Sequence, residues 1–277
     1  MGNMKKETIR LDKYLSEMGV GTRSEVKNLI RKGKVLINSE IVKRPEEKVC
    51  IGQDQIAVDG KTIGYASYEY YMLNKPAGVI SATSDPKDQT VIDLISEAKR
   101  KDLFPVGRLD KDTEGLLIIT NDGDLAHQLL SPKKHVDKVY FARVLGHVTN
   151  EDVEQFKQGL KIGQDLITMP AHLEIIRICS VTKESIQDKI VNDEAYLSEK
   201  GLLLMDENDQ ITVSEIELTI REGKFHQVKR MFEAVNKKVI YLKRISMGSL
   251  RLDETLELGQ YRPLTERELE ELINDKR

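Results

Sequence analysis

Acidic side chains gather beside a short apolar run in the segment GRLDKDTEGLLIITNDG, residues 107–123. The carboxylates of Asp110, Asp112 and Glu114 alternate with other residues just before the run LLIIT. Carboxylates with this spacing can bind a cation, attack an electrophilic centre or accept a proton. The neighbouring residues decide among these kinds of chemistry.

A calcium loop of the EF-hand type is the first candidate. Asp110, Asp112, Glu114 and Gly115 match its positions 1, 3, 5 and 6. Position 12, however, is Asn121, where the loop requires a bidentate Glu. The run LLIIT also predicts a strand where a helix should leave the loop. The pattern therefore disfavours a calcium site.

A magnesium-dependent phosphatase of the haloacid-dehalogenase type is the second candidate. Its nucleophilic motif has two Asp residues one apart followed by Thr, as Asp110, Asp112 and Thr113 do here. Pro105 and Gly107 interrupt the segment where that fold needs a continuous buried strand, and no later acidic pair obviously completes a metal site. This activity stays open as an enzymatic alternative.

The acids can also simply keep a turn between two buried strands soluble, and this interpretation suits Glu114 and Asp122. Asp110 differs, because Arg108 is two residues away and apolar residues flank the pair. A carboxylate on the floor of a cleft needs a cationic partner to stay ionised. Asp110 is therefore the candidate reactive group.

Composition predicts an ordinary globular protein. The chain has 277 residues, enough for one large domain or for a medium domain with a small one. Its apolar runs are far shorter than a membrane-spanning helix requires, which predicts a cytoplasmic protein with no membrane partner. Cys50 and Cys179 lack metal-type spacing and predict neither a metal site nor a structural disulfide.

The net charge of −3 is unevenly distributed. Residues 183–209 hold three basic and eight acidic side chains, and residues 253–277 hold four basic and eight acidic ones. The remaining residues therefore carry a net charge of +6. Because local patches matter more than total charge in binding a polyanion, the sequence allows a basic face for nucleic acid.

Residues 1–60 predict a small domain of two short helices and a hairpin. Leu11, Leu15 and Met18 recur at helical spacing, and the sequence TRSE offers a capping box from Thr22 to Glu25. The segments KVLIN and EIVKR flank an Asn-Ser turn and predict two strands. The basic side chains left outside include Arg10, Arg23, Lys27, Arg31 and Lys34.

Residues 61–277 predict a larger domain of mixed strands and helices. Strands are expected within YEYYMLNKPAGVIS, LLIIT, HVDKVYFARVLG and ITVSEIELTIREG. Helices are expected within NEDVEQFKQGL, FHQVKRMFEAV and TERELEELIND. These elements do not alternate strictly, which favours an α+β fold with a largely antiparallel sheet.

Several motifs, in this order, resemble those of the RsuA-type ribosomal RNA pseudouridine synthases, the RsuA/RluB family: YMLNKPAGVISATSDP, VGRLDKDTEGLLIITNDG, SPKKHVDKVY, EGKFHQVKRMFEAV and LGQYRPLT. Residues 1–60 resemble the αL-type RNA-binding module of a small-subunit ribosomal protein. The resemblance implies a pseudouridine synthase fold, with a largely antiparallel mixed sheet and flanking helices, after a small RNA-binding domain. An acidic insertion around residues 180–212 departs from the family pattern.

The resemblance implies an isomerase that breaks the bond from ribose to a uracil nitrogen and rejoins the base through a ring carbon, without cofactor or metal. ATSDPKDQTVIDLI and SPKKHVDKVY look more like the small-subunit enzymes, which implies 16S ribosomal RNA or a partly assembled small subunit as partner. A monomer fits so large a partner. A large-subunit enzyme and a non-catalytic ribosome-assembly factor remain alternatives.

The resemblance also assigns roles by motif position. It implies Asp110 as the catalytic carboxylate, acting as a nucleophile or as a base, and Lys229 as its cationic partner. Related enzymes often carry Arg at the position of Lys229, and Lys does not make the same bidentate contact. Tyr140 is implied to stack on the target base and to serve in proton transfer. The expected RNA-binding residues of this domain are Lys75, Arg108, Lys133, Lys134, Lys138 and Arg230, of which Arg230 is also the alternative cation for Asp110.

Overall fold

The structure is a computed structural model that describes residues 8–65, 68–131, 134–190, 193–203, 205–206, 208 and 210–274. The chain divides into two compact units. The first comprises residues 1–70 with segments 95–104 and 120–122, and the second comprises residues 71–94, 105–119 and 123–277. Among the described residues, no helix is both long and apolar enough to cross a membrane.

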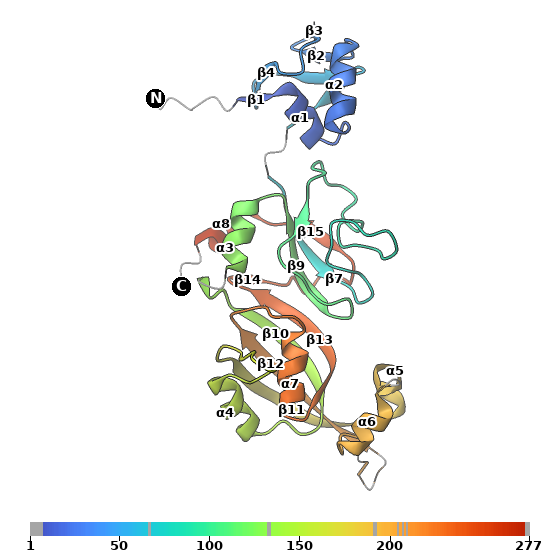
Figure 1. Cartoon of the computed structure of the whole chain (residues 1–277), viewed down its shortest axis with the longest axis vertical. Helices are drawn as coiled ribbons and strands as arrows, with labels where there is room; N and C mark the ends of the chain where they lie inside the picture. The colour runs from blue at the N-terminus through green and yellow to red at the C-terminus, as the bar shows by residue number, and fades with distance from the viewer. Residues whose placement is uncertain are drawn as a thin grey trace. The chain divides into compact units, whose positions relative to one another are not determined.

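The first unit contains the predicted pair of helices, each with one face buried against short strands (Figure 1). Its elements are β1 (Thr8–Arg10), α1 (Leu11–Glu17), α2 (Arg23–Arg31), β2 (Val35–Ile37), β3 (Glu40–Val42), β4 (Lys48–Cys50), β5 (Ile56–Val58) and β6 (Lys61–Ile63). β1 pairs with β4, and the other four form a sheet in the order β3-β2-β5-β6. Leu11, Leu15, Val26 and Ile30 are fully buried in its core.

The capping box at the start of α2 is confirmed. The backbone N–H of Glu25 donates to the Thr22 hydroxyl at 3.3 Å, and the Glu25 carboxylate accepts from the Thr22 N–H at 2.8 Å. Asn38 and Ser39, between β2 and β3, both have positive φ, as a tight hairpin turn requires. The sheet continues past residue 60 because β6 pairs with β5, so a cut at residue 60 would remove its edge strand.

One sheet of nine strands organises the second unit and confirms the expected α+β class. Its strands are β7 (Tyr70–Lys75), β8 (Phe104–Pro105), β9 (Glu114–Thr120), β10 (Lys138–Leu145), β11 (His172–Thr182), β12 (Gln210–Ile220), β13 (Lys238–Met247), β14 (Leu250–Arg251) and β15 (Tyr261–Pro263). The main path runs β11-β12-β10-β13-β9-β7-β15, with β14 on β13 and β8 on β9. β12 pairs antiparallel with β10 and with β11, β13 does so with β10 and β14, and β7 does so with β15. β9 pairs with β13 in parallel.

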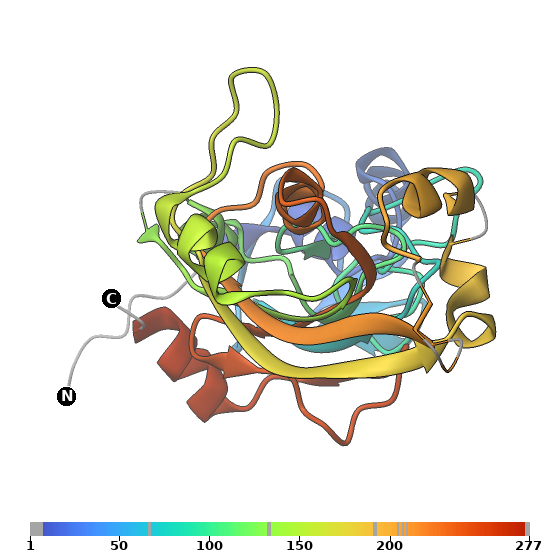
Figure 2. The same ribbon diagram turned by 90° about the horizontal axis from the view of Figure 1, so that it is seen from below.

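Helices flank this sheet on both sides. They are α3 (Gly123–Leu130), α4 (Asn150–Gln158), α7 (Gln227–Ala234) and α8 (Glu266–Asn274). Figure 2 shows α4 and α7 within the concave side of the curved strands and α8 beyond the other side. Phe156 of α4 and Phe232 of α7 are both fully buried, with ring centroids 4.9 Å apart. These two helices therefore form one layer with a shared aromatic core.

The acidic insertion folds as a small cap between β11 and β12. It contains η2 (Glu184–Ile186), α5 (Gln187–Ile190) and α6 (Glu194–Glu199), which Figure 1 shows at the ends of those strands. Ile186, Ile190 and Leu197 pack against Leu145 and Val213 of the sheet. The insertion thus has its own apolar anchor while its charged side chains stay largely outside.

Gly115, at the start of β9, allows the parallel contact between β9 and β13. Its φ is +100°, and it lies opposite Arg244 in the register. A Cβ at this position would lie 2.3 Å from the carbonyl oxygen of Arg244, which is backbone and cannot swing aside. Only glycine fits both the backbone angle and the close approach.

We predict that Gly115→Ala lowers the free energy of unfolding by at least about 3 kcal/mol, because strain and a backbone clash add. Gly123→Ala is the matched control, since a Cβ there meets nothing within 4 Å. Urea unfolding of both variants measures the difference. Equal stability of the two would contradict the proposed packing of β9 on β13.

Candidate active site

A cavity of about 560 Å³ opens in the second unit next to the turn that carries Asp110. Its wall comes from segments 80–82, 107–111 and 222–226, together with side chains of β10 and β13. Two of these segments belong to motifs that are more than 100 residues apart in the sequence. The curved sheet therefore brings distant motifs to one hollow.

Lys75 holds the turn from beneath. Its side chain is fully buried at the end of β7. Its Nζ donates to the carbonyl oxygens of Pro76, Asp110, Lys111 and Thr113 at 3.0, 3.1, 3.3 and 2.8 Å. The expectation that Lys75 contacts RNA phosphates is therefore wrong, because its ammonium group is buried and hydrogen-bonds to backbone carbonyls inside the protein.

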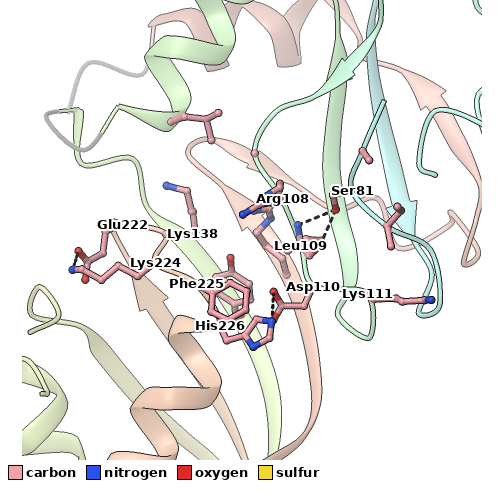
Figure 3. Close-up of a pocket in the computed structure, with 17 residues that line it drawn as sticks. Ser81, Arg108, Leu109, Asp110, Lys111, Lys138, Glu222, Lys224, Phe225 and His226 are labelled. Atoms are coloured by element: carbon pink, nitrogen blue, oxygen red, sulfur yellow. Dashed lines mark hydrogen bonds and ion pairs between the residues drawn. The ribbon is translucent and has the colours of Figure 1, made fainter. Parts of the chain in front are cut away.

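Ser81 fixes the peptide just before Asp110. Its hydroxyl donates to the carbonyl of Leu109 at 2.8 Å and accepts from the Leu109 N–H at 3.0 Å. Figure 3 shows this reciprocal pair next to Asp110. With Lys75 below and Ser81 beside it, the backbone of Asp110 is held from two directions. Ser81 was not expected from the sequence, since a lone Ser has no local signal.

The carboxylate of Asp110 lies on the cavity wall, with 27% of its side chain exposed. Lys229, expected as its cationic partner, places Nζ 3.3 Å from Oδ2. The Nε2 of His226 lies 3.6 Å from Oδ1, and Figure 3 shows the two side chains facing each other. Asp110 therefore has one nitrogen near each oxygen while remaining open to the cavity.

Lys229 also contacts Asp112, at 2.6 Å from Nζ to Oδ1. Burial alone would raise the pKa of Asp112, but the hydrogen bond and charge of Lys229 outweigh it and lower that pKa below its usual value. One ammonium thus offsets two carboxylates of the same turn. This shared cation lets acids accumulate beside the buried strand β9.

Tyr140 and Lys138 lie two residues apart on β10 and line the same cavity. Both side chains are mostly buried, each with 7% of its surface exposed. The Lys138 amine donates to the carbonyl of Val136 at 3.1 Å. Burial, helped by the positive charge of Arg244, lowers the pKa of Lys138 to about 8. Lys138 is therefore a cation of the cavity wall rather than of the outer surface.

Arg244 on β13 is a second buried cation of this wall that sequence reasoning missed. Its Nε donates to the carbonyl of Leu116 at 2.8 Å. Its Nη2 has no hydrogen-bond partner among the residues that the structure describes. A buried guanidinium nitrogen without an acceptor is unusual and points to an anionic ligand. The sequence offered no distinct signal for Arg244, because Lys238 and Lys243 lie on the same strand.

The other residues expected to bind RNA fall in different places. Arg108 is exposed and lines the cavity. Lys134 is exposed but does not line it, and Lys133 lies outside the described residues. Arg230 donates to the carbonyls of Ile162 and Phe225, so its guanidinium serves the backbone beside α7 rather than Asp110.

In the first unit, the expected RNA-binding residues are Arg10, Arg23, Lys27, Arg31 and Lys34. The three on α2 are spaced four residues apart and share one face of the helix. Arg10 forms an ion pair with Asp12 at 2.8 Å, and Lys34 forms one with Asp59 at 3.0 Å. A regular cationic face is therefore present on α2.

The structure also bears on the alternative chemistries. The residues after Asp110 form strand β9, as expected, and not the exiting helix of a calcium loop. Between the end of β7 and Asp110, the named strand is the two-residue β8, so the long buried strand of a phosphatase site does not lead into the turn. The fold around the acids therefore matches neither alternative.

Comparison with known proteins identifies the class. The family of RNA pseudouridylate synthases matches residues 69–234, and the S4 domain matches residues 9–56. The chain belongs to the RNA pseudouridylate synthase family and is an enzyme of that family.

Relatives match nearly the whole chain. The RNA pseudouridine synthase YtzG of Bacillus subtilis is 42% identical, over 96% of this chain and 99% of its own. The ribosomal small subunit pseudouridine synthases A of Vibrio parahaemolyticus and Escherichia coli are 37% and 33% identical, each over 96% of this chain and 100% of its own. A pseudouridylate synthase crystal structure matches with 33% identity and a TM-score of 0.58, over 95% of this chain and 99% of that chain.

We predict that Lys75 makes folding stability depend on pH. Burial lowers its pKa to about 8, against the opposing pull of nearby Asp112 and Asp110, whereas an unfolded lysine keeps its value near 10.5. Between these values the unfolded chain holds a proton that the folded chain has released, so stability rises with pH. In Lys75→Met this rise should be smaller.

Urea unfolding at several pH values between 7 and 10.5 measures this slope, within the window set by the lysine pKa. Lys111→Met is the matched control, because Lys111 lies in the same turn but is 53% exposed. Its slope should equal that of the wild type. Parallel curves for the wild type and Lys75→Met would contradict the prediction.

Proposed function

We propose that this enzyme converts uridine to pseudouridine at a specific position in small-subunit (16S) ribosomal RNA, with Asp110 as its catalytic residue and without a cofactor. The observation that carries the proposal is the carboxylate of Asp110, which faces the cavity while Lys229 and His226 each place a nitrogen near one of its oxygens. The choice of the small subunit is supported by the relatives from Vibrio parahaemolyticus and Escherichia coli, which carry that name.

The target uridine must leave its stack to reach Asp110, which costs a few kcal/mol that protein contacts offset. The cavity volume lies within the range of small-molecule sites. Arg108, Lys138 and Arg244 line it as cations, and we assign them to the phosphate of the flipped nucleotide. The unpartnered Nη2 of Arg244 would then gain an acceptor.

Asp110 acts on the sugar in one of two ways. It can attack the anomeric carbon, so that an ester bond forms as the bond to the uracil nitrogen breaks. Alternatively, it can take the proton of the neighbouring ribose carbon while the same bond breaks. In both routes uracil leaves with the bonding electrons and turns. A ring carbon then bonds to the anomeric carbon, as the ester breaks and frees Asp110 in the first route, or as the proton returns to the ribose carbon in the second. The ring carbon finally loses its proton, and the nitrogen that had been bound to ribose gains one. The positive charge of Lys229 lies 3.3 Å from the carboxylate that acts in both routes.

Tyr140 is proposed to stack on the flipped base and to serve in its proton transfer. Its ring lies on the cavity wall, two residues from Lys138 on the same strand. Aromatic rings are common platforms for splayed-out bases. Arg23, Lys27 and Arg31 on α2 are proposed to contact phosphates of the substrate, which positions an RNA without reading its sequence.

The proposal also covers the setting of the reaction. We assign residues 1–60, with strand β6 that follows them, to RNA binding, and the rest of the chain to catalysis, with the insertion around 180–212 as a separate cap. The substrate is ribosomal RNA, free or in a partly assembled small subunit, and the enzyme acts as a cytoplasmic monomer. The uneven charge of the chain supports an RNA substrate, since the acidic residues are concentrated in the insertion and in the last 25 residues and the remainder is basic.

We predict that Asp110→Asn abolishes pseudouridine formation while the protein stays folded and binds RNA. The matched control is Asp112→Asn, whose carboxylate contacts the same lysine but is 72% exposed, and it should retain most activity. Carbodiimide labelling with primer extension detects the product on small-subunit and large-subunit RNA, both naked and partly assembled.

Each outcome of that assay is decisive. A new stop on small-subunit RNA with the wild type alone supports the proposal. A stop only on large-subunit RNA would reassign the substrate. RNA binding without any stop would favour an assembly factor, and full activity of Asp110→Asn would remove Asp110 from the mechanism.

We predict that Lys229→Met lowers the single-turnover rate by about 10²-fold or more, because the cation that opposes Asp110 and Asp112 is lost. Lys229→Arg should retain most of the rate, since a guanidinium can contact both carboxylates. Rates at saturating RNA separate this effect from binding. A Met variant within threefold of the wild type would contradict the assigned role.

A further inference from the structure

Phe225 presents an exposed aromatic ring beside the cavity. It lies in the segment 221–226 that joins β12 to α7, and 68% of its surface is exposed. Phe is a residue type that proteins usually bury. The ring lines the same cavity as Asp110, so its exposure falls at the site of reaction rather than on a remote surface.

The ring is braced on one side by His226. Their centroids are 3.8 Å apart and their planes are inclined by 20°, which is a stacked arrangement. His226 has φ of 49°, at the residue before α7, and its Nε2 lies 3.6 Å from Asp110. Figure 3 shows Phe225, His226 and Asp110 in sequence along the cavity. The exposed ring is therefore coupled to the reactive carboxylate through one intervening side chain.

The backbone around Phe225 is also held in place. Its carbonyl accepts from Nη1 of Arg230 at 3.4 Å. The N–H of the preceding Lys224 donates to Gln227, which is buried and donates in turn to Glu222 at 2.9 Å. These bonds hold both sides of the loop. Phe225 is thus a preorganised surface, on which binding does not have to order a flexible side chain first.

We propose that Phe225, supported by His226, is a stacking platform for the nucleobase next to the target uridine in the substrate RNA. The inference rests on the proposed function. Flipping the target leaves its neighbour without one of its stacking partners, and an aromatic ring beside the cavity replaces that partner. Stacking on an aromatic side chain tolerates any base, so the platform strengthens binding without dictating sequence.

The charges of the cavity favour an RNA base over a protein side chain as the occupant. Arg108, Lys138 and Arg244 line the same hollow. A segment that places one group on Phe225 and the next beside these cations must alternate flat apolar surface with negative charge. A nucleotide chain has that alternation, with a base and a phosphate in each unit.

The test is a double-mutant cycle between Phe225 and the neighbouring base. Dissociation constants are measured by fluorescence anisotropy with a short small-subunit RNA fragment around the modified uridine, or around the strongest footprint if no uridine is modified. The assay measures binding and not turnover, so it gives a result even if the protein forms no pseudouridine. The variants are Phe225→Ala and Phe225→Trp, with Leu258→Ala as control because Leu258 is 51% exposed and does not line the cavity.

We expect Phe225→Ala to weaken binding about 5-fold to 100-fold and Phe225→Trp to bind like the wild type. Leu258→Ala should have no effect. The base on the 5′ side of the target and the base on its 3′ side are each replaced by an abasic site, in separate RNAs. One of these two replacements should weaken the binding of the wild type by a similar factor. At that flank the abasic RNA should bind Phe225→Ala no more weakly than the intact RNA does.

Two results would overturn the platform. One is unchanged affinity of Phe225→Ala for the intact fragment. The other is a loss of affinity, from the wild type to Phe225→Ala, that is equally large on the intact RNA and on both abasic RNAs. Phe225 would then act through the protein rather than through a base. Absence of pseudouridine with a normal cycle would instead refute the proposed function and leave the platform intact.

Discussion

A buried ammonium holds the turn of Asp110 together. Lys75 donates to four backbone carbonyls, three of them between Asp110 and Thr113, and this charge sits where no solvent reaches it. Burying a lysine is costly, and its lowered pKa records that cost. The cost is offset by hydrogen bonds from the ammonium to four carbonyl oxygens, which replace those that it made with water. The position of Asp110 depends on this contact more than on any other.

The acids of the turn follow from the same arrangement. Asp110, Asp112 and Glu114 surround one buried and one half-buried lysine, so the negative charge is locally compensated on both sides of the backbone. Each of these acids raises the pKa of Lys75 against the effect of burial. The apolar strand β9 that follows then anchors the turn in the sheet, and Gly115 lets it approach β13. The charged turn and the buried strand are therefore adjacent because the lysines offset the charge of the acids and the strand fixes the turn in the sheet.

Local patterns in the sequence were enough to predict the helices of the first unit, the strands β9, β10 and β12, and the capping box of α2. β11 and β13 were not predicted, because β11 exposes Ile176 and Ile178 at a sheet edge and β13 carries charged residues within its apolar run. The motifs located Asp110 and Lys229. They did not reveal that Lys75 is buried, since that depends on carbonyls more than 30 residues away.

A crystal structure of Asp110→Asn with a uridine-containing fragment of small-subunit RNA tests the central claim most directly. We expect a uridine flipped into the cavity, with its ribose within about 3.5 Å of the substituted side chain at position 110 and the Lys75 ammonium still bound to the carbonyls of the turn. A uridine bound elsewhere, or a ribose contacted by a different carboxylate, would contradict it.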